Sequence, residues 1–293
     1  MKPAPFEYHA PVTLAEALAL KARHGDEAKF LAGGQSLIPA MNFRVAQPAS
    51  LVDLNGLADL AFIRREAGEL RLGALARQRA VERSPLVKEH APLLHETMPH
   101  IAHPQIRNRG TLGGSLAHAD PAAELPVIAV ALDARLRAQS VRGERWIPAA
   151  EFFVSLFTTA LEPDEMLVEV ALPALPARTG TAFLEAARRH GDYAMLGAAA
   201  VVTLDAAGRC ERARLVFLNA GEGPVDARQA AGQLAGQALT AEALAAAAGH
   251  AAEHEISPLG GVHASVDYQR HLARVLGRRA LSLAADRARS AGH

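Results

Sequence analysis

Two short glycine-containing segments carry the residue types best suited to binding an anion. Residues 32–36 read Ala-Gly-Gly-Gln-Ser and follow an apolar, strand-like run, while residues 111–115 read Thr-Leu-Gly-Gly-Ser. Adjacent glycines permit positive φ angles and close backbone approach, and successive amides in such a loop form a concavity that binds anions. The hydroxyls of Ser36, Thr111 and Ser115 would add donors. Two such loops could jointly hold a pyrophosphate without a lysine or a magnesium ion.

Each glycine segment alone is also compatible with a tight turn that binds nothing. Two common nucleotide-binding motifs are absent, because no Gly-x-Gly-x-x-Gly follows the first expected strand and no Gly-x-x-x-x-Gly-Lys-Ser/Thr occurs anywhere. Rossmann-type and P-loop binding are therefore disfavoured. The spacing by itself indicates a dinucleotide or diphosphate binder.

The residues that could ligate a metal form no recognisable metal site. His100, His103 and His118 lie near the second glycine segment, but they lack a helical i, i+4 pair with a carboxylate. The single cysteine, Cys210, excludes an internal disulfide and any iron-sulfur or zinc site built from four cysteines. A metal redox centre would therefore belong to another chain.

The elements expected around the first glycine segment are one helix and two strands. Thr13 and Glu16 form a capping box, and Gly25 stands where the helix would end, so a helix is predicted at residues 13–24. Short apolar runs at 29–32 and 51–54 end in turn-forming residues and predict strands.

Mixed α and β structure is expected around the second glycine segment. Asp120 and Pro121 are suited to the N-cap and first position of the helix that follows. Strands are expected at 70–75, 134–141 and 167–172, and helices at 81–100 and 122–132.

A domain boundary is expected at residues 173–176, where two prolines in four residues disfavour a helix or a central strand. Beyond it, alanine-rich helical sequence follows the strands, and its last helix is predicted at 265–289. Strands are expected at 181–188, 198–204 and 212–218. An arginine row on the last helix is interpreted as a solvated face, with a partner contact as the alternative.

Composition and charge exclude several classes of partner. The 293 residues are 50% apolar, which suggests about two domains with a substantial core. Positive and negative side chains balance at 31 each, so neither nucleic acid nor an anionic membrane surface is an expected partner. The sequence has neither an apolar run of about 20 residues nor a leader, so a cytoplasmic location is expected.

Taken together, these segments resemble one family. Residues 31–39 (LAGGQSLIP), 51–54 (LVDL) and 105–108 (QIRN) leading into 111–114 (TLGG) are similar to the FAD-binding medium subunit of carbon monoxide dehydrogenase and to the flavin domain of xanthine dehydrogenase. The resemblance covers essentially the whole chain, including its opening residues and residues 188–193.

The resemblance implies an α+β fold with two domains. Residues 1–175 would form the two-subdomain FAD-binding fold of the vanillyl-alcohol oxidase/PCMH type, with subdomains at about 1–56 and 57–175. Residues 177–290 would form a C-terminal domain of a three-stranded antiparallel sheet with helices.

The resemblance also implies one non-covalently bound FAD and the residues that hold it. Glu124 stands where the family usually has an aspartate that contacts FAD, Leu167 would lie against the flavin region, and Tyr193 would cover one face of the isoalloxazine. Leu184 and Gln35 replace a lysine of the xanthine enzymes and a histidine of many carbon monoxide enzymes. The implied FAD-binding residues are Ala32, Gly33, Gly34, Gln35, Ser36, Leu37, Thr111, Gly113, Gly114, Ser115, Glu124, Leu167 and Tyr193.

The function implied is that of an FAD-carrying electron-transfer subunit of a multi-subunit molybdenum hydroxylase. Electrons would come from [2Fe-2S] clusters in a small iron-sulfur subunit and leave to an external acceptor, while a large subunit would hold the molybdenum cofactor. The expected assembly is a dimer of heterotrimers, and no catalytic residue is assigned to this chain. Two alternatives stay open: a self-sufficient FAD-dependent oxidase or dehydrogenase, and a flavin-free scaffold subunit.

Overall fold

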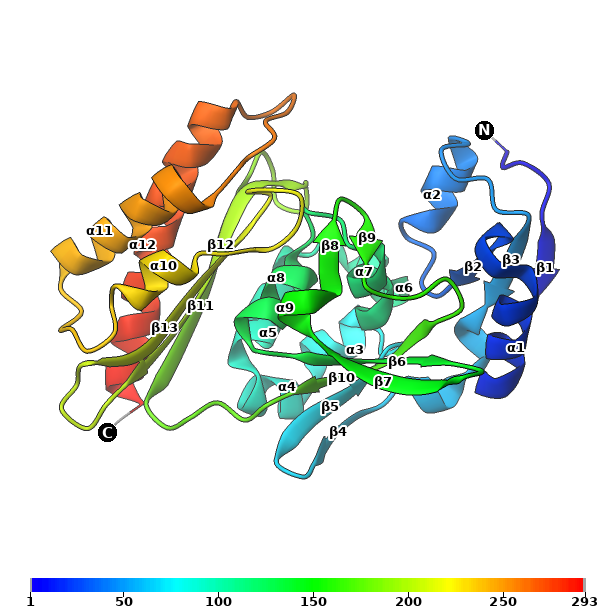
Figure 1. Ribbon diagram of the computed structural model, residues 1–293, viewed down its shortest axis with the longest axis horizontal. Helices are drawn as coiled ribbons and strands as arrows, with labels where there is room; N and C mark the ends of the chain where they lie inside the picture. The colour runs from blue at the N-terminus through cyan, green and yellow to red at the C-terminus, as the bar shows by residue number, and fades with distance from the viewer. Residues whose placement is uncertain (1, 292–293) are drawn as a thin grey trace.

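The first sheet of the computed structural model, which describes residues 2–291, is small and parallel (Figure 1). Its strand order is β1-β3-β2, and α1 packs against it through Ala17 and Leu18. The capping box at Thr13 is present and Gly25 caps the other end of α1, so this helix is confirmed. The elements are β1 (Glu7–His9), α1 (Leu14–His24), η1 (Gly25–Glu27), β2 (Ala28–Leu31), α2 (Leu37–Asn42), β3 (Ser50–Asp53), η2 (Leu54–Gly56) and η3 (Ala58–Leu60).

The second sheet has five antiparallel strands in the order β4-β5-β10-β6-β7. These strands are β4 (Ile63–Glu66), β5 (Glu69–Gly73), β6 (Arg135–Ser140), β7 (Gly143–Pro148) and β10 (Met166–Leu172). Helices cover one face, and a two-stranded sheet of β8 (Phe153–Ser155) and β9 (Thr158–Thr159) lies beside them (Figure 1). The helices are α3 (Gln78–Arg83), α4 (Pro85–His90), α5 (Pro92–Thr97), η4 (Met98–His100), α6 (Pro104–Arg109), α7 (Leu112–His118), α8 (Glu124–Ala131) and α9 (Ala149–Phe152).

Two helix predictions in this region were wrong in detail. The single helix expected at 81–100 is divided, because Pro85 and Pro92 each start a new helix at a position where a missing N–H costs nothing. The helix expected from residue 122 begins at Glu124 with the extended Ala123 as its N-cap. Asp120 instead closes a turn, since its carboxylate accepts the amide of Ala122 at 2.9 Å.

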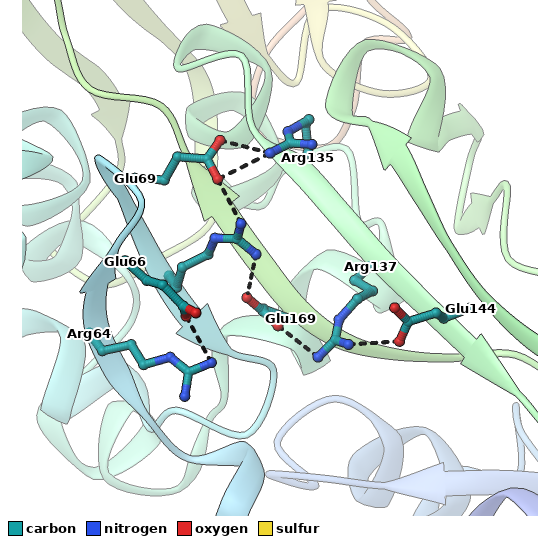
Figure 2. Close-up of polar contacts among 8 residues, drawn as sticks. Arg64, Glu66, Glu69, Arg135, Arg137, Glu144 and Glu169 are labelled. Atoms are coloured by element: carbon teal, nitrogen blue, oxygen red, sulfur yellow. Dashed lines mark hydrogen bonds and ion pairs between the residues drawn. The ribbon is translucent and has the colours of Figure 1, made fainter.

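The face of the second sheet opposite the helices carries a ladder of ion pairs (Figure 2). Side chains alternate along each strand, so the residues between the buried leucines point to this face. Glu169, only 3% exposed, lies between Arg71 at 2.9 Å and Arg137 at 2.7 Å. Arg71 also pairs with Glu69 at 2.9 Å. The ladder thus links β5, β10 and β6 across the middle of the sheet.

The third sheet is antiparallel, in the order β11-β12-β13-β14, and α12 lies across it (Figure 1). A Cβ on Gly180 would lie 2.0 Å from the carbonyl oxygen of Ala284, so α12 packs directly on the backbone of β11. The expected three strands are present with a two-residue fourth. The elements are β11 (Thr179–Ala187), β12 (Ala194–Leu204), β13 (Cys210–Leu218), β14 (Val225–Asp226), α10 (Arg228–Gly232), α11 (Ala241–His250), the π-helix η5 (Ala251–Glu255) and α12 (Val266–Ser290).

The face of the third sheet that α12 does not cover shares a hydrophobic core with the helices that cover the second sheet. Phe183, Val216 and Leu218 belong to the same apolar cluster as the buried residues of α5 and α8. Arg287 on α12 strengthens this junction, because its Nη1 donates to Glu96 on α5 and to the carbonyl of Thr181, both at 2.6 Å. The α+β class expected from the sequence is confirmed.

Among residues 2–291, the structure has no helix of the length and apolarity that a membrane span requires.

The single cysteine of the chain is buried. Cys210 begins β13 and is 1% exposed. Burial, with a contribution from Asp205, raises the pKa of its thiol to about 11.

Candidate cofactor site

The first glycine segment is an open turn between β2 and α2. Gly34 has φ of 73°, in the left-handed region that glycine adopts without strain. Within residues 2–291, the four successive amides of residues 33–36 donate to no protein acceptor. The side chain of Gln35 folds back and donates to the carbonyl of Gly33 at 3.2 Å. Four free amides in a turn are the donors that the predicted anion-binding concavity would need.

The second glycine segment is the start of a helix, which corrects the prediction of a loop with free amides. Thr111 is the N-cap of α7, and its Oγ1 accepts the amide of Gly114 at 3.0 Å. The amides of Leu112 and Gly113 donate to carbonyls of the segment after β5, at 3.0 and 2.8 Å. These three amides are already engaged and Thr111 is only 2% exposed, so the half-buried Ser115 carries the accessible hydroxyl of this segment.

The two segments lie against each other, as predicted. A Cβ on Gly33 would be 2.4 Å from the carbonyl oxygen of Arg109 and 2.8 Å from the Cα of Gly110. A Cβ on Gly114 would be 3.6 Å from the Cβ of Ala32. Only glycine at position 33 permits this approach, because the atoms it meets are backbone atoms that cannot move aside.

A cleft of about 480 Å³ opens at this junction. Predicted residues 32–35 line it, but six other lining residues were not predicted. Two of them, Asp53 and Asn55, lie at or just after the end of β3. They were not predicted because the sequence at this point was interpreted only as a turn. The lining residues are Leu31, Ala32, Gly33, Gly34, Gln35, Ile38, Pro39, Asp53, Asn55 and Arg109.

A network of hydrogen bonds joins several residues that line the cleft to their neighbours. Tyr8 donates to Asp53 at 2.5 Å, and Asn55 donates to the carbonyl of Ala32 at 3.1 Å. Arg77 donates to the side chain of Asn55 at 2.5 Å and also to the carbonyl of Arg109. Although burial raises the pKa of Asp53, the hydrogen bonds from Tyr8 and Asn55 lower it on balance. Asp53 therefore stays ionised and orders the groups around it.

Arg109 supplies the positive charge of the cleft. It is the basic residue in the lining of the cleft, and its charge helps to lower the pKa of Asp53. Burial and then the charge of Arg109 lower the pKa of Arg77, which places the two cations near each other. The cleft is thus lined by the free amides of residues 33–35, by the guanidinium of Arg109 and by the carboxylate of Asp53. Free amides and a guanidinium are the donors that an anion such as a diphosphate needs.

Ser36, Leu37 and the predicted residues from Thr111 onward are not among the residues that line the cleft. Tyr193 lies near Asp120 and Glu124, and desolvation, followed by the charges of these two carboxylates, raises its pKa. The Tyr193 side chain is 74% exposed, whereas Leu167 on β10 is 5% exposed and sits in the core.

Comparisons with known proteins show which family the chain belongs to. Residues 4–175 match the family described as FAD binding domain in molybdopterin dehydrogenase, and residues 181–284 match the CO dehydrogenase flavoprotein C-terminal domain. The chain is 47% identical to the 6-hydroxypseudooxynicotine dehydrogenase complex subunit alpha of Paenarthrobacter nicotinovorans, covering 99% of this chain and 97% of the relative. It is 37% identical to the carbon monoxide dehydrogenase medium chain of Hydrogenophaga pseudoflava, covering 97% and 98%.

A solved structure extends the likeness to the whole fold. The carbon monoxide dehydrogenase of Hydrogenophaga pseudoflava that lacks the Mo-pyranopterin moiety superimposes with a TM-score of 0.95 and 38% identity, covering 98% of this chain and 99% of that one. The family resemblance inferred from the sequence is confirmed. This chain is an oxidoreductase subunit with FAD as its cofactor, and it belongs to the family of FAD-binding medium subunits of molybdenum hydroxylases.

Proposed function

We propose that this chain binds one FAD non-covalently and passes electrons from [2Fe-2S] clusters of a small partner subunit to an external acceptor. The observation that carries the proposal is the set of four free amides at residues 33–36, which open on a cleft with Arg109 in its wall. When bound, FAD supplies the capacity to take up and release one or two electrons. The chain's own residues bind and orient it.

Several of the proposed site residues have tasks that follow from their positions. The amides of residues 33–36 and the guanidinium of Arg109 hold the diphosphate, and Gly33 permits the close approach of the two segments. Ser115 contributes a hydroxyl, and Thr111 holds the start of α7 in place as its N-cap. Glu124, Leu167 and Tyr193 belong to the flavin end. The proposed set is Ala32, Gly33, Gly34, Gln35, Ser36, Leu37, Thr111, Gly113, Gly114, Ser115, Glu124, Leu167 and Tyr193, with Arg109 added.

In the proposed domain division, the cofactor lies between the two subdomains of the FAD-binding domain. We propose an FAD-binding domain at 1–175, with subdomains at about 1–56 and 57–175, and a C-terminal domain at 177–290. The contact of Gly33 with Arg109 and Gly110 joins residues of the two subdomains. A ligand in the cleft would therefore touch both and hold them together.

The proposed partners are a small iron-sulfur subunit and a large subunit with the molybdenum cofactor, in a dimer of heterotrimers. Support comes from the relatives, since the one from Paenarthrobacter nicotinovorans is named as part of a dehydrogenase complex. A single buried cysteine, Cys210, cannot hold an iron-sulfur cluster. Electrons must then reach this chain from outside it.

The test is to purify the full chain, record its absorption spectrum, release the chromophore by heat and identify it by chromatography. About one FAD per chain, together with co-purification of an iron-sulfur protein and a molybdenum protein, is expected. A colourless chain that fails to take up added FAD would refute the proposal. Reduction of the isolated flavoprotein by an organic substrate, without other subunits, would favour the self-sufficient oxidase or dehydrogenase instead.

A further inference from the structure

The backbone of Arg77 is fixed beside the second glycine segment. Arg77 forms an antiparallel bridge with Thr111, and the amide of the next residue, Gln78, donates to the carbonyl of Gly110 at 2.9 Å. Arg77 is also the N-cap of α3, with an extended backbone. Its side chain therefore starts from a fixed point in the second of the two proposed subdomains.

The guanidinium of Arg77 joins the two sides of the cleft. Its Nη2 donates to Oδ1 of Asn55 at 2.5 Å, and its Nη1 donates to the carbonyl oxygen of Arg109. Asn55 follows β3 in the first subdomain, whereas Arg109 ends α6 in the second. The last carbonyls of a helix lack intrahelical partners, so the guanidinium satisfies a group that needs a donor. One planar side chain thus connects both subdomains.

Asn55 continues this connection to the first glycine segment. Its Nδ2 donates to the carbonyl of Ala32 at 3.1 Å and to Oδ1 of Asp53 at 2.5 Å. The other carboxylate oxygen of Asp53 accepts the hydroxyl of Tyr8 on β1. Because both side-chain hydrogens of Asn55 are donated, its oxygen is the atom that remains for Arg77. The side-chain amide is therefore held in one orientation.

The carbonyl that Arg77 holds lies over the first glycine segment. A Cβ on Gly33 would be 2.4 Å from the Arg109 oxygen. Arg77 therefore reaches the first segment by two routes, through Asn55 to Ala32 and through the Arg109 carbonyl to Gly33. Arg77 is half-buried and does not line the cleft, whereas Asn55 and Arg109 do. It can shape the cleft without contacting what the cleft holds.

We propose that Arg77 is a positioning residue for the cofactor, which holds the two glycine segments at the spacing that a diphosphate needs and so sets the affinity for FAD. This inference rests on the proposed function for the identity of the ligand. An arginine suits the task, because its planar fork offers several donors in fixed directions, whereas a lysine has one donor nitrogen on a flexible stem. The position requires the fork, and a positive charge alone does not replace it.

The first test follows hydrogen exchange in the flavin-free full chain. Arg77→Gln should speed the exchange of amides at residues 54–57 and at residues 109–112, because each side of the junction loses a hydrogen-bond donor. Arg64→Gln is the matched control and should exchange like wild type, since Arg64 lies on β4 and pairs with Glu66 at 3.0 Å. Unchanged exchange in either segment of Arg77→Gln would overturn the proposal, whether or not the chain binds FAD.

The second test measures the dissociation constant for FAD by titration of flavin-free chains. Arg77→Gln should raise it roughly tenfold, the effect of losing a charged hydrogen bond. Arg77→Lys should raise it to a similar extent, because one ammonium does not reproduce the fork. Asn55→Ala should also weaken binding, and the double variant Arg77→Gln/Asn55→Ala should bind no more weakly than the weaker single variant, since both changes break one connection. Arg64→Gln should bind like wild type.

Wild-type affinity in Arg77→Lys would show that Arg77 acts through its charge and would overturn the proposal. Losses that multiply in the double variant would overturn it as well, because they would indicate two independent contributions. A role in overall stability alone predicts neither the failure of lysine nor the shared loss. If exchange responds to Arg77→Gln but wild type binds no FAD, the proposed function fails and the cofactor role of Arg77 fails with it, while the bridge between the subdomains stands. If wild type binds FAD and Arg77→Gln binds it equally well, only the role of Arg77 fails.

Discussion

Cofactor binding depends directly on the absence of a Cβ atom at Gly33. Gly33→Ala would place a Cβ 2.4 Å from the carbonyl oxygen of Arg109, so the two segments must separate. We expect the dissociation constant for FAD to rise at least about tenfold, equivalent to roughly 1.4 kcal/mol. Titration of the flavin-free chain with FAD measures it. Gly249→Ala, where a Cβ meets nothing within 4 Å, is the control, and equal affinities for the two variants would contradict the assignment.

The buried carboxyl of Glu124 predicts a specific pH dependence of stability. Its pKa is raised from 4.5 to about 7 in the folded chain, so the folded state binds this proton more tightly than the unfolded state. The resulting stabilisation is complete below the unfolded pKa and is lost as the pH rises through 7. Between about pH 5 and about pH 8, the free energy of unfolding of wild type should fall by up to about 3 kcal/mol more than that of Glu124→Gln. Denaturant titrations at several pH values check this, and parallel curves would exclude it.

At the scale of elements, the sequence predicts those helices and strands whose formation depends on residues close together in the chain. The capping box at Thr13 and Glu16 forms within one helical turn, and α1 was predicted correctly. The role of the second glycine segment was not predictable, since the carbonyls that accept its amides lie in the segment after β5, far away in sequence. Arg109 was missed for the same reason, because only the fold brings it to the wall of the cleft.

The ion-pair ladder on the second sheet gives a prediction for this element (Figure 2). Glu169→Gln would leave Arg71 and Arg137 without their shared buried carboxylate. Arg71 would keep Glu69 and Arg137 would keep Glu144, but each would lose a charged hydrogen bond to the buried carboxylate, so a loss of about 2 kcal/mol in unfolding free energy is expected. Glu144→Gln removes an exposed partner of Arg137 and should cost under about 1 kcal/mol. Chemical denaturation compares the two, and similar losses would mean that the ladder is solvated.

At the scale of the whole molecule, the shared core between the second and third sheets should make unfolding cooperative. Phe183, Val216 and Leu218 complete the core above α5 and α8, although they follow the linker in sequence. We expect a single calorimetric transition whose van't Hoff and calorimetric enthalpies agree. A fragment ending at residue 175 should aggregate, because those helices would expose apolar faces. Two separate transitions, or a well-folded fragment, would show that the domains are independent.

The burial of Cys210 makes the native chain chemically equivalent to a cysteine-free protein for thiol-directed reagents. At 1% exposure and with a pKa of about 11, its sulfur is neither accessible nor ionised under ordinary labelling conditions. A cysteine introduced at Val262, which is 98% exposed, would then be the single reactive position. A spin label or fluorophore attached there would report encounters with other subunits, without prior removal of the native thiol.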